Sequence, residues 1–193
     1  MCGICGKISL REPVDENLIR KMCEVLKHRG PDDEGVYVSQ RAESRGHRVN
    51  VGLGHRRLSI IDLSSAGHQP MSNEDGSIWL VMNGEIFDYD VLMENLQDRG
   101  HHFDSHCDTE VAVHLFEDYW DRALDSMDGQ FALAVHDRHD NRLLLARDRM
   151  GICPLFYAVT GELLIFGSEM KAIFATGLLE PKVDPGALDA VLA

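Results

Sequence analysis

Apolar side chains recur along the chain with two periodicities, one typical of strands and one typical of helices. Alternating or short apolar runs, typical of strands, cover residues 3–10, 36–38, 51–55, 77–82, 130–136, 142–147, 155–159 and 163–166. Apolar residues spaced three and four apart, typical of helices, cover residues 16–27, 88–99, 109–119, 168–175 and the tail from 187. The last four strands follow one another with tight turns and predict one antiparallel sheet. The whole pattern predicts an α+β fold.

Local signals mark the ends of these elements and the side chains that face inward. Asp15 is expected as the N-cap of the first helix, and Gly100 as the residue that ends the second. The spacing places Cys23 in the core, and it places Val91 and Leu96 on the buried face of the second helix.

The composition is that of a globular domain, with 193 residues, 44% hydrophobic and 26% charged. A formal net charge of −13 argues against nucleic acid or an anionic membrane as a partner, because both need basic patches. No apolar run reaches the ~18 residues of a membrane span, and the N-terminus lacks the pattern of a secretory signal. We therefore expect a cytoplasmic protein whose five cysteines are reduced.

Cys2 is the first candidate for chemistry. If Met1 is removed, one residue carries a thiol and a free α-amine, with ordinary pKa values of about 8.5 and about 7.7–8.0. Such a residue is a nucleophile with its own base. The alternative is a cysteine without a role that happens to follow the initiator methionine.

Three further positions can serve either binding or structure. Arg56 and Arg57 interrupt an apolar stretch, so one of them is a candidate for holding a carboxylate, or both are surface charges. Asn83-Gly84 is either a tight turn or a pair of donors for an oxyanion. Asp108 is an acid at the start of a helix, which the helix dipole favours in any case.

Metal-ligand residue types are concentrated between His101 and Glu110. Their spacing fits neither paired Cys-x-x-Cys nor paired His-x-x-x-His ligands. Cys2-x-x-Cys5 also lacks a second pair, and on a strand Cys5 points away from Ile4. We therefore expect no metal site.

Eight motifs in the same order along nearly the whole chain resemble those of class II glutamine amidotransferase domains. They are residues 1–4 (Met-Cys-Gly-Ile), 28–32 (His-Arg-Gly-Pro-Asp), 55–62 (His-Arg-Arg-Leu-Ser-Ile-Ile-Asp), 83–86 (Asn-Gly-Glu-Ile), 107–110 (Cys-Asp-Thr-Glu), 128–132 (Asp-Gly-Gln-Phe-Ala), 147–151 (Arg-Asp-Arg-Met-Gly) and 168–172 (Ser-Glu-Met-Lys-Ala). Within this family they are most similar to the N-terminal glutaminase domains of glutamine-hydrolysing asparagine synthetases.

The resemblance implies an N-terminal-nucleophile hydrolase fold, a four-layer αββα sandwich of two antiparallel sheets. It also implies that processed Cys2 attacks the side-chain amide of glutamine, forms a thioester and releases ammonia, after which water releases glutamate. Arg57 would hold the α-carboxylate, Asp108 and Glu85 the α-ammonium group, and Asn83 with the Gly84 N–H the oxyanion, while the backbone of Ile60 and Ile61 would line the pocket. Arg56 is then expected at the surface, and His28 and Arg29 are expected to support the nucleophile strand.

The resemblance further implies a domain plan. Residues 1–182 would form the glutaminase domain, and residues 183–193 would begin a linker to a C-terminal synthetase domain that this chain lacks. The glutaminase would need no cofactor, whereas ATP and magnesium would bind only in the synthetase domain. Cys153, where relatives often carry lysine, is expected to be remote from glutamine. An inactive partner-binding module, the glutaminase half of another amide-forming or β-lactam-forming synthetase, and a homodimer all stay open.

Overall fold

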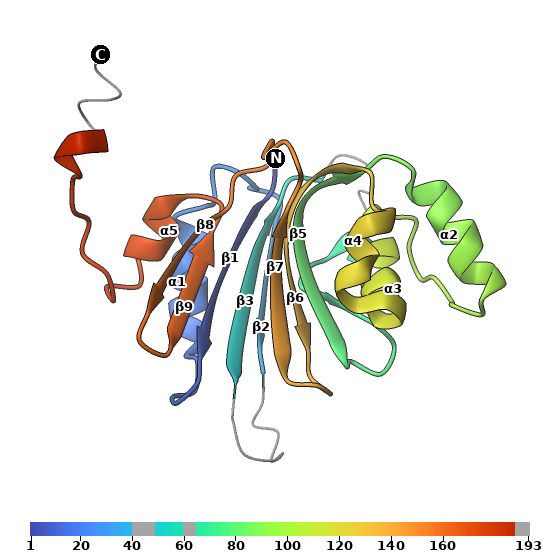
Figure 1. The fold of residues 1–193 in the computed structure, drawn as a ribbon, viewed down its shortest axis with the longest axis horizontal. Coiled ribbons are helices and arrows are strands. Elements are labelled where there is room, and N and C mark those ends of the chain that lie inside the picture. The colour runs from blue at the N-terminus through green and yellow to red at the C-terminus, as the bar shows by residue number, and fades with distance from the viewer. Residues whose placement is uncertain (40–48, 60–64, 188–193) are drawn as a thin grey trace.

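The structure is a computed structural model that describes residues 1–39, 49–59 and 65–187 (Figure 1). In these residues two antiparallel sheets lie face to face, and helices cover the outer face of each sheet. The predicted α+β fold with four αββα layers is confirmed.

The first sheet has the strand order β2-β3-β1-β9-β8. Its strands are β1 (Gly3–Ser9), β2 (Asp33–Val38), β3 (Asn50–Arg57), β8 (Phe156–Thr160) and β9 (Leu163–Gly167). Helices α1 (Glu16–Glu24) and α5 (Met170–Phe174) pack on its outer face. Because β1 pairs with β3 on one side and β9 on the other, the strand that follows the N-terminus is held along both edges.

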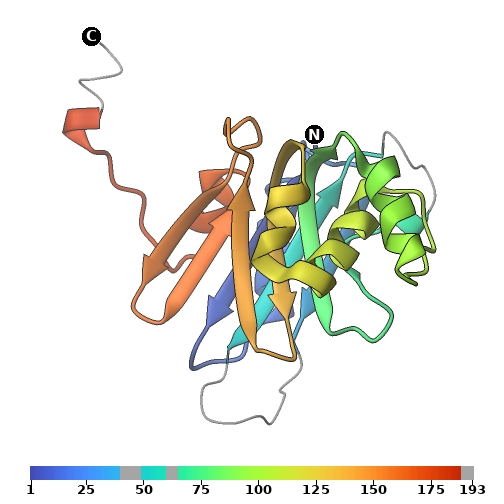
Figure 2. The same ribbon diagram turned by 45° about the vertical axis from the view of Figure 1, so that its right-hand side comes forward.

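The second sheet has the order β4-β5-β6-β7. Its strands are β4 (Met71–Ser72), β5 (Ile78–Ile86), β6 (Gly129–Asp137) and β7 (Arg142–Arg147). Helix α3 (Asp108–Tyr119) packs directly on β5, and helices α2 (Tyr89–Asp98) and α4 (Ala123–Ser126) pack on α3, as the turned view in Figure 2 shows. Short 3-10 turns span Ser65–Gly67 and Trp120–Arg122.

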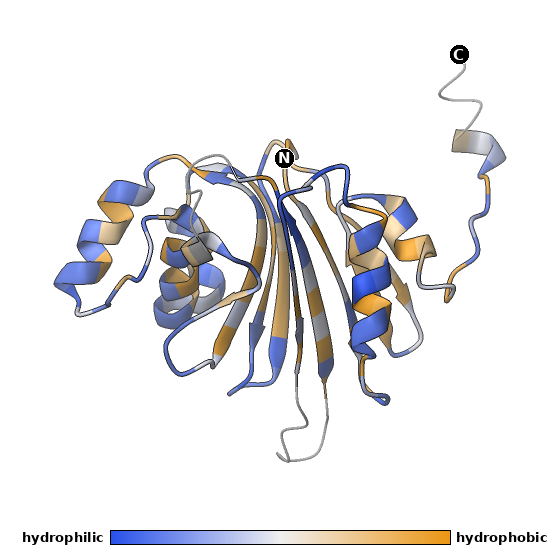
Figure 3. Ribbon diagram, turned by 180° about the vertical axis from the view of Figure 1, so that it is seen from behind, coloured by the Kyte–Doolittle hydropathy of each residue, from blue (hydrophilic) through white to orange (hydrophobic). Residues whose placement is uncertain are grey.

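The core lies in three layers. Between the sheets, Ile4, Leu53 and Phe166 of the first sheet meet Val81 and Ala134 of the second. One outer layer joins α1 to the first sheet, and the other joins α3 to the second. Figure 3 shows apolar and polar residues mixed along the strands and helices. Strands β1 and β3 are buried along their whole length, because their sheet lies between the other sheet and the helices.

Glycines on β3 let α1 lie close to the sheet. A Cβ at Gly54 would stand 2.5 Å from Cys23 Sγ and 2.8 Å from the side chain of Ile19. A Cβ at Gly52 would meet Val14 at 2.6 Å. The position of α1, and with it the chain that leads from α1 into Arg29, therefore depends on bare backbone at these two places.

The predicted helix signals are confirmed. Asp15 caps α1, its Oδ1 accepting a hydrogen bond from the Asn17 N–H at 2.9 Å. Gly100 follows α2 with φ of 101°, and Cys23 is fully buried. Within the described residues, no helix is both long and apolar enough to span a membrane.

Two expectations about the fold are wrong. The last four strands do not form one sheet: β6 and β7 belong to the second sheet, and β8 and β9 to the first, because the chain crosses between the sheets after Arg147. Val91 is 59% exposed, since the buried side of α2 is carried by Met93 and Leu96. The predicted helix of the tail lies outside the described residues from residue 188 onward.

We expect Gly54→Ala to lower the free energy of unfolding by about 1–3 kcal/mol, because the new methyl group overpacks the contact between α1 and β3. Urea unfolding followed by circular dichroism measures the change. Gly186→Ala is the matched control, since its Cβ would meet only the Asp184 carboxylate at 3.4 Å. Equal stabilities of the two variants would contradict the close packing of α1.

Candidate active site

A cavity of about 240 Å³ is lined by residues of both sheets and by Met1 and Cys2. Figure 1 shows the N-terminus at the ends of the two sheets. The walls of the cavity come from both sheets, from the start of α3 and from the loop that follows β7. The lining residues are Met1, Cys2, Arg57, Leu58, Gly67, Gln69, Met82, Asn83, Gly84, Glu85, Cys107, Asp108, Thr109, Gln130 and Cys153.

The Cys2 thiol meets the backbone at the end of β3. The Leu58 N–H donates to Cys2 Sγ at 3.4 Å, and the thiol reaches the Leu58 carbonyl oxygen at 3.8 Å. Cys2 is only partly buried, so the sulfur is positioned and yet accessible from the cavity. The Leu58 backbone thus fixes the position of the sulfur.

A cation and a carboxylate hold the backbone of Cys2 from behind. Arg29 Nε donates to the Cys2 carbonyl oxygen at 2.9 Å, and Arg29 Nη1 pairs with Glu169 at 3.2 Å. Glu169 also pairs with His28 at 2.7 Å and with Lys171 at 2.9 Å. Burial acts to raise the pKa of Glu169, but hydrogen bonds from Lys171, His28 and Arg29 outweigh it and lower that pKa to about 2. The expected support by Arg29 is confirmed, whereas His28 contacts Glu169 and Lys171 and reaches the strand only through the Glu169–Arg29 pair.

Both arginines at the end of β3 are buried, with exposed fractions of 6% for Arg56 and 9% for Arg57. Arg56 pairs with Glu34 at 2.7 Å and donates to the Gly30 carbonyl oxygen at 2.9 Å, so its expected surface position is wrong. The reason is that β3 continues to Arg57 and places Arg56 opposite Glu34 of β2. Arg57 lies in the cavity wall, against Gly67, where a Cβ would overlap its guanidinium group.

Asn83 lies within β5, which runs on to Ile86, so the tight-turn alternative for Asn83-Gly84 is wrong. Asn83 is fully buried and lines the cavity, and neither its Oδ1 nor its Nδ2 has a hydrogen-bond partner among the described residues. A buried polar group without a partner costs about 1–3 kcal/mol. The neighbouring Gly84 has no room for a side chain, since a Cβ would overlap the Gln130 carbonyl oxygen, and its backbone is exposed.

Asp108 and Glu85 bring negative charge to the wall of the same cavity that Arg57 lines. The Ile86 N–H donates to Asp108 Oδ2 at 3.0 Å, which fixes the first residue of α3 against the end of β5. Burial raises the pKa of Asp108, and the charge of Glu85 adds to that effect, while hydrogen bonds from the Ile86 and Thr109 backbone oppose it. A cation in the cavity would compensate both carboxylates.

Gln69 is a site residue that sequence reasoning missed. Its Oε1 accepts from the Met82 N–H at 2.7 Å, and its Nε2 donates to Thr109 Oγ1 at 3.0 Å. Gln69 thus ties β5 to α3 across the cavity wall. A glutamine before a proline in a polar loop carries no sequence signal for such a role.

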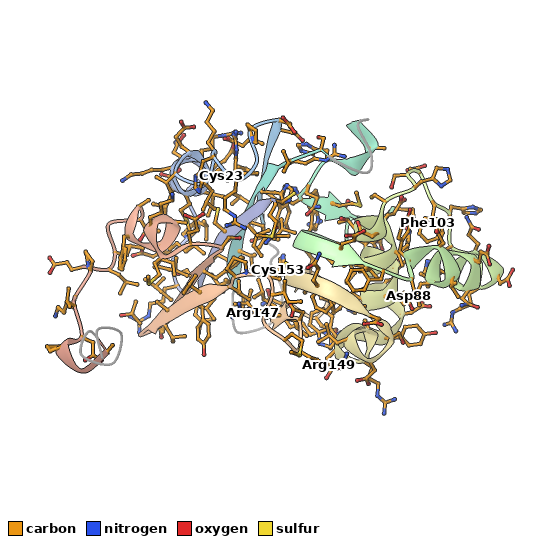
Figure 4. All side chains as sticks on the ribbon, turned by 90° about the horizontal axis from the view of Figure 1, so that it is seen from above. Cys23, Asp88, Phe103, Arg147, Arg149 and Cys153 are labelled. Carbon is orange, nitrogen blue, oxygen red and sulfur yellow. The ribbon has the colours of Figure 1, made fainter. Side chains whose placement is uncertain are left out.

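Cys153 also lines the cavity, so the expectation that it lies far from the site is wrong. It is 1% exposed, and Figure 4 shows it between the two sheets. The Asp148 carboxylate accepts from the N–H groups of Ile152 at 2.9 Å and Cys153 at 3.0 Å, which folds the loop after β7 back over the cavity. Burial raises the pKa of the Cys153 thiol, and the nearby Asp148 and Cys2 raise it further.

Cys5 does not join this group. Its Sγ lies 3.6 Å from Cys23 Sγ in the layer beneath α1, on the face of β1 opposite Ile4, as expected. Within the described residues, no three metal-ligating side chains of the cavity converge on one point.

Most predicted site residues are brought together. Those that line the cavity are Cys2, Arg57, Asn83, Gly84, Glu85 and Asp108. Ile60 and Ile61, predicted to contribute backbone, lie outside the described residues. The cavity thus combines a thiol, a guanidinium group, two carboxylates and an unpartnered amide.

Comparisons with known proteins agree with this geometry. A sequence profile described as "Glutamine amidotransferase domain" matches residues 1–193. The chain is 40% identical over 179 residues to asparagine synthetase [glutamine-hydrolyzing] 2 of Bacillus subtilis (strain 168), covering 91% of this chain and 22% of that protein. It is 38% identical over 177 residues to asparagine synthetase [glutamine-hydrolyzing] 1 of the same organism, covering 90% of this chain and 26% of that protein. The chain thus spans about a quarter of the length of these relatives.

The fold has solved counterparts. Glutamine phosphoribosylpyrophosphate (PRPP) amidotransferase from B. subtilis, complexed with ADP and GMP, superposes with a TM-score of 0.73 at 22% identity. The superposition covers 91% of this chain and 44% of that one. At this identity the likeness concerns the fold.

We expect Asp108→Asn to raise the stability of the ligand-free protein at neutral pH. Because the folded-state pKa of Asp108 is raised, the folded protein holds this proton to a higher pH than the unfolded chain. The stabilising effect of the proton is therefore present at low pH and is lost as the pH rises through the folded pKa. Urea unfolding at several pH values should show the two proteins converging below about pH 4, the ordinary range of Asp. A pH-independent difference would contradict a desolvated, titrating Asp108.

Proposed function

The chain belongs to the glutamine amidotransferase domain family, and on that premise we propose that Cys2 hydrolyses glutamine through a thioester and supplies ammonia for amide synthesis. The observation that carries the proposal is the composition of the cavity around the thiol. A free amino acid with a side-chain amide presents a carboxylate, an ammonium group and a carbonyl carbon. The cavity offers a guanidinium group, two carboxylates, and a nucleophile beside an unpartnered amide.

The size of the cavity supports an amino-acid substrate. Its volume of about 240 Å³ is below the ~300–1,000 Å³ typical of pockets for drug-sized ligands. Arg57 holds the α-carboxylate with its planar fork, and Gly67 keeps space for that fork. Asp108 and Glu85 bind the α-ammonium group. Its positive charge offsets the effect of burial, which raises the pKa of Asp108.

The chemistry begins when the Cys2 sulfur adds to the amide carbon and the carbonyl π electrons move onto oxygen. The α-amine of Cys2 takes the thiol proton and returns it to the amide nitrogen, so that ammonia leaves as the C–N bond breaks. Water then adds to the thioester carbon, the C–S bond breaks, and glutamate departs with the thiol restored. No cofactor takes part in these steps.

The oxyanion that forms in both additions needs donors of its own. Asn83 Nδ2 is buried at the cavity without a partner among the described residues, and the exposed backbone of Gly84 offers an N–H beside it. Both donors are fixed by strand β5 before substrate arrives, as electrostatic preorganisation requires.

Met1 must be removed for this mechanism. While Met1 is attached, the Cys2 nitrogen is an amide without basicity, and Met1 itself lines the cavity. Removal frees the amine and enlarges the space in front of the sulfur. A reducing compartment such as the cytoplasm keeps the thiol available.

The proposal extends to a partner domain that accepts ammonia. It is supported by the relatives' names and by the fact that this chain matches about a quarter of their length. Met150 and Ile152 are 83% and 55% exposed on the same loop whose Cys153 lines the cavity, and Tyr157 and Val159 of β8 are also exposed. An apolar surface that close to the cavity suits a docked domain. In asparagine formation this domain would bind ATP and magnesium and would activate aspartate.

We expect the processed protein to release ammonia and glutamate from glutamine, and Cys2→Ala to lower kcat by more than about a thousandfold, because no other group replaces the nucleophile. Coupled glutamate assays measure the rate, and intact mass shows whether Met1 is gone. An electrophilic glutamine analogue should add once, at Cys2. Cys23→Ala removes a thiol from the core beneath α1 and is the matched control. Full activity in Cys2→Ala would exclude the mechanism and leave a binding module as the alternative.

Asn83→Ala and Arg57→Lys should separate catalysis from binding. Loss of the Asn83 donor should lower kcat by about 10²–10³ with little change in KM, because the oxyanion exists only along the reaction path. Loss of the bidentate fork in Arg57→Lys should mainly raise KM, by about 10–100-fold. Steady-state kinetics at saturating and limiting glutamine measure both effects. A change mainly in KM for Asn83→Ala, or mainly in kcat for Arg57→Lys, would contradict these roles.

A further inference from the structure

A second cluster of chemically active side chains lies on the α2–α3 side of the molecule, away from the cavity. His101 follows α2, while His114 and Glu117 lie one turn apart on the same face of α3. His101 Nδ1 stands 3.1 Å from His114 Nδ1, and Glu117 Oε2 stands 3.2 Å from His114 Nδ1 and 3.9 Å from His101 Nδ1. Within the described residues, this is the group whose three ligand atoms converge.

The second ring nitrogen of His101 faces a carboxylate. His101 Nε2 lies 3.3 Å from Asp118 Oδ1, and Asp118 is in turn paired with Arg99 at 2.9 Å. An ionised carboxylate only accepts hydrogen bonds, so in the neutral ring Nε2 carries the proton. The Nδ1 of His101 therefore directs a lone pair toward His114 and Glu117.

The three facing atoms share few hydrogen-bond donors within the cluster. With His101 Nδ1 and Glu117 Oε2 both acceptors, the single proton available at His114 Nδ1 faces two acceptors, at 3.1 Å and 3.2 Å. It makes a straight hydrogen bond to one and leaves the other without a donor from this group. His114 is 2% exposed, so its buried nitrogen has little access to water. A cation placed among the three lone pairs satisfies all of them at once.

The spacing fits a transition-metal ion. Donor atoms bound about 2.1 Å from a tetrahedral ion lie about 3.4 Å from one another. The three separations in the cluster, from 3.1 to 3.9 Å, bracket that value. The contact between His101 and Asp118 is also the one that metal-bound histidines make, because a carboxylate that accepts from the second ring nitrogen orients the ring and raises its basicity.

We propose that His101, His114 and Glu117 bind one divalent transition-metal ion, with zinc as the best match to two imidazoles and one carboxylate. Solvent supplies the fourth ligand, because the Glu117 side chain is 35% exposed. The ion joins the segment after α2 to the third turn of α3. Phe103, labelled in Figure 4, packs its ring 4.8 Å from that of His114 and covers one side of the site.

The position of the site explains what the ion would do. His101 starts the segment that runs to Cys107 and Asp108, and Glu110 Oε1 already accepts from the Asp104 N–H at 2.8 Å near its middle. A metal bond at His101 fixes the other end of this segment to the same helix. The ion is thus structural and takes no part in chemistry at Cys2, since none of its ligands lines the cavity.

The test is cobalt(II) titration of untagged, chelator-treated protein, with zinc used in competition. We expect one cobalt per chain, visible d–d absorption of a tetrahedral N/O site, and displacement by zinc. His101→Gln and Glu117→Gln should each weaken binding by at least tenfold, and Asp118→Asn by about 10–100-fold. His102→Gln is the matched control, because His102 is an exposed neighbour outside the cluster, and it should bind cobalt as the unaltered protein does.

Three results would overturn the proposal. They are no cobalt bound at a stoichiometric concentration, binding that survives in both His101→Gln and Glu117→Gln, or a near-ultraviolet thiolate band that places the metal on cysteine. Circular dichroism of each variant separates loss of the ligand from loss of the fold. Glutamine hydrolysis is measured in parallel and should be unchanged in Glu117→Gln, so the outcome is independent of the proposed function.

Discussion

The hydrogen bond from Arg29 to the carbonyl oxygen of Cys2 holds the backbone of Cys2, and the rest of the site depends on the position of this residue. Residues near the end of a chain are ordinarily among the least ordered parts of a domain. Here β1 is paired on both edges, and Glu169 holds Arg29 in place from the start of α5. The backbone of Cys2 is therefore held as firmly as that of a core residue, while its thiol stays accessible from the cavity.

The site keeps several polar groups in conditions that disfavour them. Asn83 is buried without partners among the described residues, and burial raises the pKa of Asp108. His55 of β3 is buried, and its Nε2 donates to the Met82 carbonyl oxygen at 3.1 Å; desolvation lowers its pKa to about 3, so it stays neutral. His55 links the two sheets through Nε2, although its Nδ1, like the Asn83 side chain, has no partner among the described residues. Asn83 and Asp108 line the cavity, so a ligand there can interact with both. Functional sites often sacrifice stability in this way.

Much of the fold could be predicted from the sequence, because helix caps and apolar spacing are local. Asp15, Gly100 and Cys23 lie as expected. The partition of the last four strands between two sheets could not be predicted, since the same local pattern serves either pairing. It depends on where the chain crosses after Arg147.

The site, like the fold, could be predicted only in part. Cys2, Arg57, Asn83 and Asp108 belong to motifs and were predicted to act together, which their shared cavity supports. The cavity positions of Gln69 and Cys153 arise only when distant segments fold together, so spacing gave no hint of them. The burial of Arg56 was missed because one extra strand residue decides which side of a sheet a side chain faces.

Strand β8 is the outermost described strand of its sheet, and Tyr157 and Val159 are exposed on it. An outer strand with apolar side chains is a template on which a second chain can add its own strand. Its coverage by another domain would therefore protect the protein against aggregation, independently of any transfer of ammonia.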